Sequence, residues 1–230
     1  MGFHRGPSIV KDGLVVHLDA ANTKSYPGTG NTWSDLSGNG NNGTLINGPI
    51  FNSNNSGIIQ FDGGNDTTIV NNVPINTNSL EGNTVEQFLK WNGSDNEMPF
   101  SWFDIPLDIW IRYGGIGINN GSSLLYGTSN QGLSNKWIHL VIFFPNNWSS
   151  RSGDAKMWIN GEEKEMTVFN GTFTNRTIPN PVRVSIGSGY NNNNSYNFGG
   201  SIANTRIYNK ELSDDEVIQN YNAQRSRFES

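Results

Sequence analysis

Leu107-Asp-Ile-Trp-Ile-Arg-Tyr113 indicates the fold of this 230-residue chain more clearly than any other segment. Apolar and polar side chains alternate along it. In an extended strand, the odd-numbered residues from Leu107 to Tyr113 would share one face, and Asp108, Trp110 and Arg112 would share the other. A period of two is typical of a β-strand with one face in a hydrophobic core.

Similar short apolar segments recur along the chain, each bounded by Gly, Asn or Pro, and they predict an all-β protein. Further strands are expected at 13–18, 58–61, 67–70, 84–89, 124–126, 137–144, 156–159, 181–186 and 201–208. Asn160-Gly161 predicts a hairpin, because both residues tolerate the positive φ of a two-residue turn. In the strand at 181–186, Val182, Val184 and Ile186 would point inward, whereas Arg183 and Ser185 would point outward.

The C-terminal end carries a helix signal. Ser213-Asp-Asp-Glu216 fits a capping box, in which the serine hydroxyl and the glutamate carboxylate each accept the other residue's backbone amide. Leu212 and Val217 fit a hydrophobic staple across the same turn. We therefore expect one short helix at about 213–224, packed on the sandwich.

Composition limits the possible functions. The chain has no cysteine, 34% hydrophobic residues and a net charge of -5, so it can bury a core without disulfides but lacks the cationic surplus that binds nucleic acid. No apolar run approaches the roughly 20 residues that cross a bilayer, and the start lacks the apolar middle of a secretion signal. We expect a single domain at 11–230, preceded by an arm at 1–10 that is either a free tail or a strap to a neighbouring subunit.

Several segments, taken in order, resemble the laminin-G-like branch of the concanavalin A-type lectin and glucanase superfamily. They are Gly13-Leu-Val-Val-His-Leu-Asp-Ala-Ala-Asn22, the run from Tyr26 to Thr44, Phe61-Asp-Gly63, Lys136-Trp-Ile-His139, Trp158-Ile-Asn-Gly161 and the run from Ile202 to Ser213. The resemblance implies a two-sheet antiparallel jelly-roll sandwich with one concave face.

The opening Gly6-Pro-Ser-Ile-Val10 resembles copies of this domain in virion proteins of tailed bacteriophages. That resemblance implies a virion protein assembled in the host cytoplasm, without membrane insertion. The leading expectation is a non-catalytic structural or decoration protein of a capsid or tail. It would contact other virion proteins and form a homo-oligomer or lattice. The alternative is a carbohydrate-binding module of a tail fibre that recognises host surface glycans, and a glycoside hydrolase relative is the third choice.

Catalytic signals are weak. Glucanases of the superfamily use Glu-x-Asp-x-x-Glu on one strand, and no such triplet occurs here. The nearest candidate is Phe103-Asp-Ile-Pro-Leu-Asp108, where a proline interrupts the strand, which favours a turn followed by a surface-facing Asp108. His17 and His139 stand alone beside apolar neighbours, so we expect half-buried structural imidazoles.

A sugar-binding role would need exposed aromatic rings that stack on the sugar, with amides that bond its hydroxyls. Trp33, Trp137 and Trp158 stand in the family's strand and turn motifs, so we expect them in the core. The candidates are therefore Trp148 in a polar loop, and Tyr190 and Tyr196, which bracket an asparagine tract that includes Asn192. An exposed tryptophan could equally anchor an interface between subunits.

Calcium is the only cofactor that the sequence suggests, because hard cations prefer carboxylate and amide oxygens. Two loops supply such groups: Asp35, Asn39 and Asn41 in one, and Asp62 and Asp66 in the other. The alternative is that these side chains bond their own backbone in Asx-turns.

Overall fold

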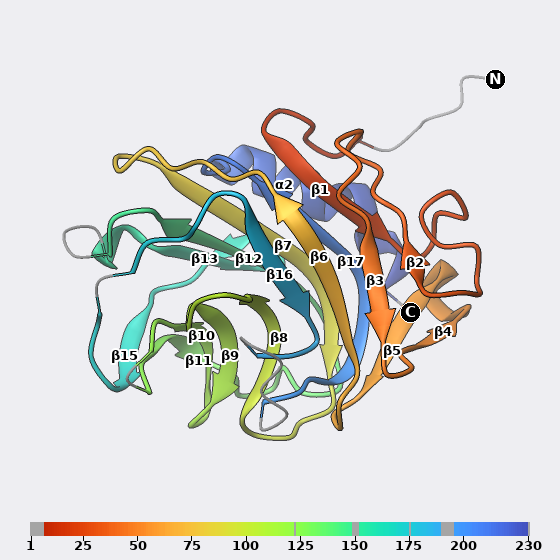
Figure 1. Cartoon of the computed structure of the whole chain (residues 1–230). Coiled ribbons are helices and arrows are strands. Elements are labelled where there is room, and N and C mark those ends of the chain that lie inside the picture. Colours follow the sequence, from red (N-terminus) through yellow and green to blue (C-terminus); the bar gives the residue numbers. More distant parts are fainter. Residues whose placement is uncertain (1–6, 122, 149–151, 175, 190–195, 230) are drawn as a thin grey trace.

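The computed structural model describes residues 7–121, 123–148, 152–174, 176–189 and 196–229. Two antiparallel β-sheets pack face to face, and one helix lies across the outer side of one of them (Figure 1). The sequence prediction of an all-β sandwich with a short C-terminal helix is confirmed.

Sheet A contains eight strands. In spatial order they are β14 (Glu162–Glu163), β13 (Lys156–Ile159), β12 (Trp137–Pro145), β7 (Gly82–Trp91), β17 (Gly199–Tyr208), β5 (Ile58–Asp62) and β4 (Ile50–Asn52), with β1 (Leu14–Asp19) also paired to β17. β7 pairs along one side of β17, and on the other side β17 pairs β5 along its first half and β1 along its second half. The Asn160-Gly161 turn joins β13 to β14, as predicted.

Sheet B contains nine strands. In spatial order they are β15 (Thr167–Asn170), β11 (Leu125–Ser129), β10 (Gly115–Asn119), β9 (Asp108–Arg112), β8 (Glu97–Trp102), β16 (Val182–Ile186), β6 (Thr67–Val73), β3 (Gly43–Ile46) and β2 (Thr32–Trp33). The three-residue η1 (Asn54–Ser56) and η2 (Ser152–Asp154) lie in connections between strands.

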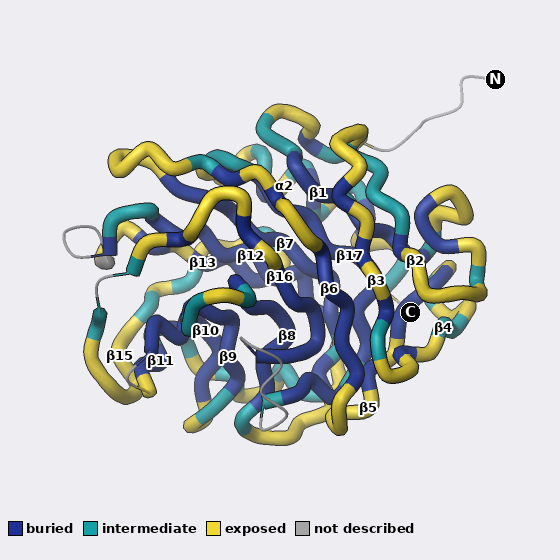
Figure 2. The backbone as a smooth tube through the Cα atoms, in the orientation of Figure 1, coloured by how far each residue is buried: buried dark blue, intermediate teal, exposed yellow. Residues whose placement is uncertain are grey.

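The main core fills the space between the sheets, where the central strands are buried (Figure 2). Leu107, Ile109 and Ile111 point into it, as their alternation predicts. Tyr113 does not, because it follows the strand at a φ of 56° and is 43% exposed. The opposite face of β9 is buried as well, which the alternation alone does not predict.

The second face of β9 belongs to a smaller apolar cluster on the outer side of sheet B. Trp110, Met98 and Leu125 form this cluster, and Tyr196 packs against it. Ser185 points to this outer side, as predicted, but it is fully buried there and donates its hydroxyl to the Ser188 carbonyl at 2.8 Å. Trp110 is covered by Tyr196, which is far from it in sequence, and local alternation does not reveal such a contact.

The helix α2 (Asp214–Gln224) begins at the predicted capping box, with the Ser213 hydroxyl accepting the Glu216 amide at 3.3 Å. Leu212 and Val217 are both fully buried in one cluster that also contains Val10. The Val10 amide donates to Asn220 Oδ1 at 2.7 Å, and Gln219 donates to the Ser8 carbonyl at 2.6 Å. Residues 8–10 of the predicted arm are therefore fastened to the helix of their own chain.

Below α2, a buried group of charged side chains joins the helix to sheet A. Glu86 accepts hydrogen bonds from Arg206 at 2.6 Å and Asn220 at 2.7 Å, and lies 2.9 Å from His139 Nε2. The side chains of Glu86, Arg206 and His139 are fully buried. His139 is thus the predicted structural imidazole, although it is completely rather than half buried.

Candidate functional site

Four side chains form a straight row across the outer face of sheet A. Lys90 of β7 lies directly opposite Trp137 of β12 on one side and Ser201 of β17 on the other, and Ser201 lies opposite Gln60 of β5. Residues directly opposite one another in an antiparallel pair point to the same face. With strands about 4.8 Å apart, the row spans about 14 Å.

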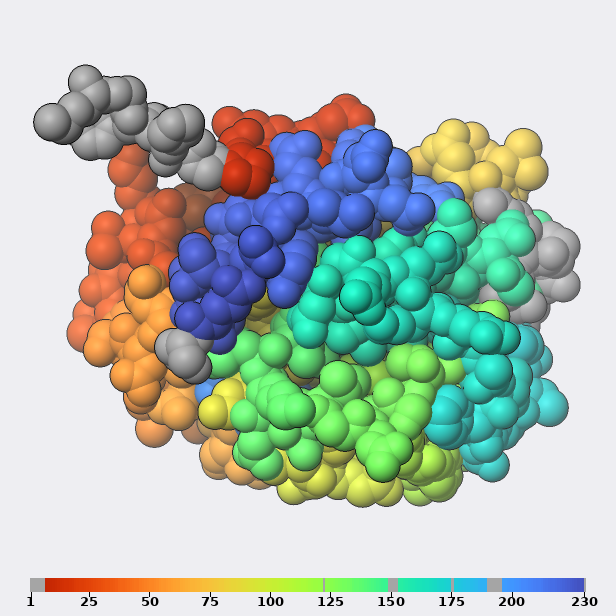
Figure 3. Space-filling model, turned by 180° about the vertical axis from the view of Figure 1, so that it is seen from behind, coloured from red at the N-terminus to blue at the C-terminus, as the bar shows by residue number. Residues whose placement is uncertain are grey.

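The row lies at the point where the C-terminal segment stops covering the sheet. After α2, the η4 turn (Arg225–Arg227) brings Phe228 onto Phe88 with ring centroids 4.6 Å apart, and onto Trp137 at 4.7 Å. Phe88 stands two residues before Lys90 on the same face of β7, so it is covered whereas Lys90 is not. From behind, the C-terminal segment crosses this face and ends between the orange β4–β5 region and the green loops (Figure 3).

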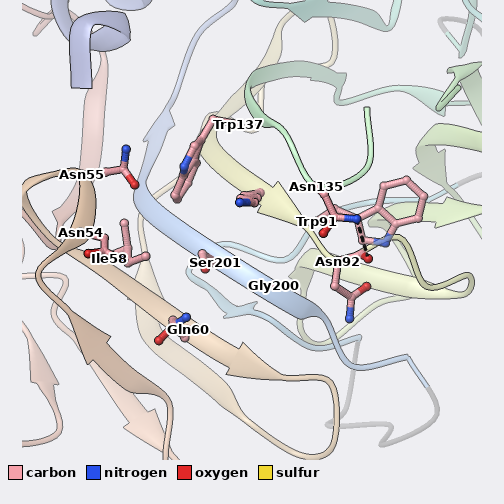
Figure 4. Close-up of a pocket in the computed structure, with 11 residues that line it drawn as sticks. Asn54, Asn55, Ile58, Gln60, Trp91, Asn92, Asn135, Trp137, Gly200 and Ser201 are labelled. Atoms are coloured by element: carbon pink, nitrogen blue, oxygen red, sulfur yellow. Dashed lines mark hydrogen bonds between the residues drawn. The ribbon is translucent and has the colours of Figure 1, made fainter. Parts of the chain in front are cut away.

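A pocket of about 230 Å³ opens along this row (Figure 4). Its lining residues come from four strands and the loops beside them: Asn54, Asn55, Ile58, Gln60, Lys90, Trp91, Asn92, Asn135, Trp137, Gly200 and Ser201. This volume is below the 300 to 1,000 Å³ typical of sites for drug-sized ligands, so the pocket suits one small unit or part of a longer polymer.

Two glycines allow the backbone to form the pocket walls. Gly57 has a φ of 138°, and a Cβ there would lie 2.4 Å from the Ala20 carbonyl oxygen. A Cβ on Gly200 would lie 2.2 Å from the Lys90 carbonyl oxygen. Only glycine permits these close approaches, which place the end of the η1 turn against the residues after β1 and place β17 against β7.

Arg227 fixes the C-terminal segment beside the pocket. It donates to the carbonyls of Asn55 and Gly57, each at 3.1 Å, and its guanidinium lies 3.1 Å from the Asp19 carboxylate. Asn55 returns a hydrogen bond from its amide to the Arg227 carbonyl at 2.7 Å. The wall carrying Asn55 and the segment carrying Phe228 are therefore held together.

The pocket offers one partly exposed indole surrounded by amides with remaining hydrogen-bonding capacity. Asn135 uses one amide proton on the Asn92 carbonyl at 3.2 Å, and Gln60 Oε1 accepts from Asn52 at 3.3 Å. Each primary amide has two donors and an acceptor, so every one of these side chains keeps unused groups. Such a lining can hydrogen-bond hydroxyl groups while Trp137 supplies an apolar wall.

Trp137 was expected in the core, and that expectation is wrong, because its ring lies on the outer face of sheet A. The alternation in Trp137-Ile-His139 is the signal that could have placed it there, since Ile138 and Leu140 face the main core. Trp33 and Trp158 are buried as expected.

Trp148 is only 1% exposed, so the expectation of an exposed ring is wrong. Its indole stacks near Phe173, with centroids 6.3 Å apart, and closes one end of the main core. The flanking polar residues indicate a loop, but a large apolar ring can still turn inward from a loop.

Tyr196 lies on the opposite side of the sandwich from the pocket. It packs edge-on against Trp110 of sheet B, with centroids 5.4 Å apart. Tyr190 and Asn192 lie outside the described residues. The structure does not bring Tyr196 or Trp148 together with the lining of the Trp137 pocket.

The predicted calcium ligands make hydrogen bonds within the chain. Asp35 accepts from the amides of His17 at 2.8 Å, Ser37 at 2.9 Å and Asn41 at 3.0 Å. The Asn39 and Asn41 side chains donate to carbonyls of β1, at 3.2 and 2.7 Å. This pattern fixes the loop against β1 and corresponds to the Asx-turn alternative.

The second predicted loop is arranged in the same way. Asp66 Oδ2 accepts the Asp62 amide at 3.1 Å, and Asp62 Oδ1 accepts the Gly64 amide at 2.7 Å. Burial raises the pKa of the Asp66 carboxyl. Among the described residues, no group of three or more His, Cys, Asp or Glu side chains is arranged to hold a metal ion.

The carboxylates considered for catalysis lie apart from the pocket lining. Asp104 pairs with Arg183 at the surface, whereas Asp108 is fully buried and accepts from Asn119 at 2.7 Å. The prediction of a surface-facing Asp108 is wrong, because the outer side of β9 is covered. Burial raises the pKa of Glu97 to about 7, and its carboxylate accepts the Gly199 amide at 3.0 Å.

Residues 62–218 match the family model described as the concanavalin A-like lectin/glucanases superfamily. The chain belongs to this superfamily. The matched region includes three of the four residues of the row, with Gln60 just before it. No curated protein matches the chain.

Solved structures share the fold at low sequence identity. The ligand-binding domain of botulinum neurotoxin serotype D, in complex with N-acetylneuraminic acid, is 18% identical with a TM-score of 0.61, covering 94% of this chain and 52% of the toxin chain. Domain 4 of AbnA, an extracellular arabinanase from Geobacillus stearothermophilus in complex with arabinotriose, is 18% identical with a TM-score of 0.59, covering 90% and 98%. Trypanosoma rangeli sialidase in complex with sialic acid is 13% identical with a TM-score of 0.62, covering 95% and 34%.

The chain spans about half the length of the toxin binding domains that it matches. Within the described residues, no helix has the length and apolar character needed to cross a membrane.

Proposed function

We propose that this chain is a non-catalytic carbohydrate-binding module and that the row Trp137–Lys90–Ser201–Gln60 is its binding surface. The observation that carries the proposal is the partly exposed Trp137 ring in a pocket whose other side chains are mostly amides. Sugars present apolar C–H faces and a rim of hydroxyls, which match an indole wall with amides around it.

The register of the sheet supports a site for an extended ligand. The four residues lie on neighbouring strands of one rigid sheet, so their spacing is set by backbone pairing and not by a mobile loop. A row about 14 Å long exceeds one sugar ring, which suits a chain of sugars crossing the strands. Rigid positioning limits the entropy lost when the ligand binds.

Similar solved domains also support a binding role. They include a toxin ligand-binding domain in complex with N-acetylneuraminic acid and an arabinanase domain in complex with arabinotriose. The pocket lining among described residues contains no carboxylate, whereas glycoside hydrolysis uses a pair of them about the scissile bond. We infer that the pocket holds a saccharide without cleaving it.

Titration calorimetry against a panel of oligosaccharides tests this function. We expect saturable binding by the wild type and at least about tenfold weaker binding by Trp137→Ala, because the packing of a sugar's C–H face on an aromatic ring is worth on the order of 1 kcal/mol or more. Phe169→Ala is the matched control, since Phe169 is 38% exposed on sheet B. Equal loss in both variants, or no loss in Trp137→Ala, would reject the Trp137 surface.

A location on a bacteriophage particle stays a prediction from the sequence resemblance. A carbohydrate-binding module fits the tail-fibre alternative, in which many weak sites act together through multivalency. Immunogold labelling of purified particles from the source culture would test it: label on fibre tips is expected, and label on the capsid shell would instead support the decoration role.

A further inference from the structure

We infer that the Trp137 pocket prefers saccharides that carry a carboxylate, and that Lys90 is the residue that pairs with it. This inference rests on the proposed carbohydrate-binding function. It adds a ligand class, acidic sugars such as uronic or sialic acids, and a specificity-determining residue.

Lys90 is the only charged side chain among the described residues that line the pocket. It makes no hydrogen bond or ion pair with any part of the chain that the structure describes. By contrast, Lys156, Lys164 and Lys210 each reach a carboxylate at 2.7 Å. Lys90 is half-buried as a residue and lines the pocket, so an anionic ligand bound there would supply the partner that its ammonium lacks within the described chain.

Other charges near the pocket are already engaged. Arg227 pairs with Asp19, and Asp62, two residues after Gln60 on the same face of β5, accepts the Gly64 amide. The chain carries a net charge of -5, so its overall field does not attract anions. Attraction of an acidic sugar would therefore come from Lys90 locally, within the roughly 8 Å over which charges act at physiological salt.

The row places Lys90 directly beside the Trp137 ring on which a sugar would stack. Lys90 is one strand away from Trp137, about 4.8 Å in the pairing direction. A carboxyl group on a sugar projects from the ring by one bond, so one residue of an acidic sugar can contact both side chains. Ser201, one strand further, and then Gln60 would meet the hydroxyls of the next ring.

Two matched ligand pairs test the inference by calorimetry. The first is an oligomer of galacturonic acid against its methyl ester, and the second is 3′-sialyllactose against lactose. We expect the acid of at least one pair to bind about fivefold to tenfold more tightly than its neutral counterpart, as for a single partly screened charge pair. The pair that shows the preference distinguishes uronic from sialic acids.

Lys90→Gln should remove the acid preference while changing the affinity for the neutral ligand by less than about twofold. Lys136→Gln is the control, because Lys136 adjoins Trp137 in sequence but does not line the pocket. It should keep the preference.

The outcomes separate the two proposals. Equal binding of acid and neutral ligands, both lost in Trp137→Ala, would overturn the acidic-sugar inference and leave the proposed function standing. A preference that survives in Lys90→Gln would also overturn it. If the wild type binds none of the four ligands nor any member of the oligosaccharide panel, both proposals fail.

Discussion

Glu86 joins helix α2 to the buried charged group of sheet A, because its carboxylate accepts the Asn220 amide at 2.7 Å. Burial raises its pKa, but the neighbouring Arg206 and His139 outweigh that effect and lower the pKa to about 2. The Glu86 carboxylate thereby stays ionised between two cationic or proton-donating groups and the Asn220 amide. Removing its charge would leave the buried Arg206 guanidinium unpaired, which costs far more than losing a surface pair.

We expect Glu86→Gln to lower the free energy of unfolding at pH 7 by about 3 kcal/mol, measured by urea denaturation. Asp104→Asn, which removes the surface partner of Arg183, should cost less than about 1 kcal/mol. Similar losses of unfolding free energy in the two variants would show that the buried Glu86–Arg206 pair contributes no more than the surface Asp104–Arg183 pair.

The same substitution has a defined pH dependence. Because the pKa of Glu86 is lower in the folded state than in the unfolded state, its contribution is present above about pH 4.5 and is lost as the pH falls toward 2. The difference in unfolding free energy between the wild type and Glu86→Gln should therefore shrink over that range. A constant difference from pH 7 to pH 2 would contradict the lowered pKa.

At the scale of elements, the C-terminal segment both covers sheet A and supports the pocket. Phe228 packs between Phe88 and Trp137, and Arg227 ties the segment to the wall that carries Asn55. The Phe228 ring lies 4.7 Å from the Trp137 ring between centroids, so it supports one side of the indole. A ring held in place before binding loses less entropy when a ligand arrives.

Phe228→Ala should therefore weaken saccharide binding about threefold or more, although Phe228 does not line the pocket. Ile218→Ala is a suitable control, because Ile218 is an apolar residue of α2 that is 42% exposed and does not line the pocket. Calorimetry with the tightest ligand of the panel measures the effect. Unchanged affinity in Phe228→Ala would show that Trp137 needs no such support.

The elements themselves were largely predictable from local patterns. Alternation located β9 and β16, the apolar run located β12, and the Ser213–Glu216 spacing located the start of α2 to within one residue. These signals are local, because strand faces and helix caps are specified by residues a few positions apart.

At the scale of the whole molecule, the candidate site was not predictable in the same way. Gln60, Lys90, Trp137 and Ser201 are far apart in sequence, and only the register of four strands brings them into one row. The row is exposed only because the chain after α2 stops covering sheet A at Phe228, which comes 20 residues after the end of β17. Trp137, expected in the core, therefore lies on the outer face, and Trp148, expected to be exposed, is buried. Polar neighbours in the sequence indicate a loop but do not determine which way an aromatic ring points.

We expect ligand binding on the outer face of sheet A and none on the outer face of sheet B. Sheet A presents the Trp137 pocket, whereas on sheet B the Trp110 ring is only 3% exposed and Tyr196 packs against it. A ligand that binds the chain should thus perturb one face and leave the other unchanged.

The most direct test is an NMR titration of ¹⁵N-labelled protein with the oligosaccharide that binds most tightly. We expect saturable shifts of the Trp137 indole N–H and of the side-chain amides of Gln60 and Asn135, with the Trp110 indole unmoved. Shifts confined to Trp110 and the amides around Tyr196, with Trp137 unmoved, would contradict binding on the outer face of sheet A.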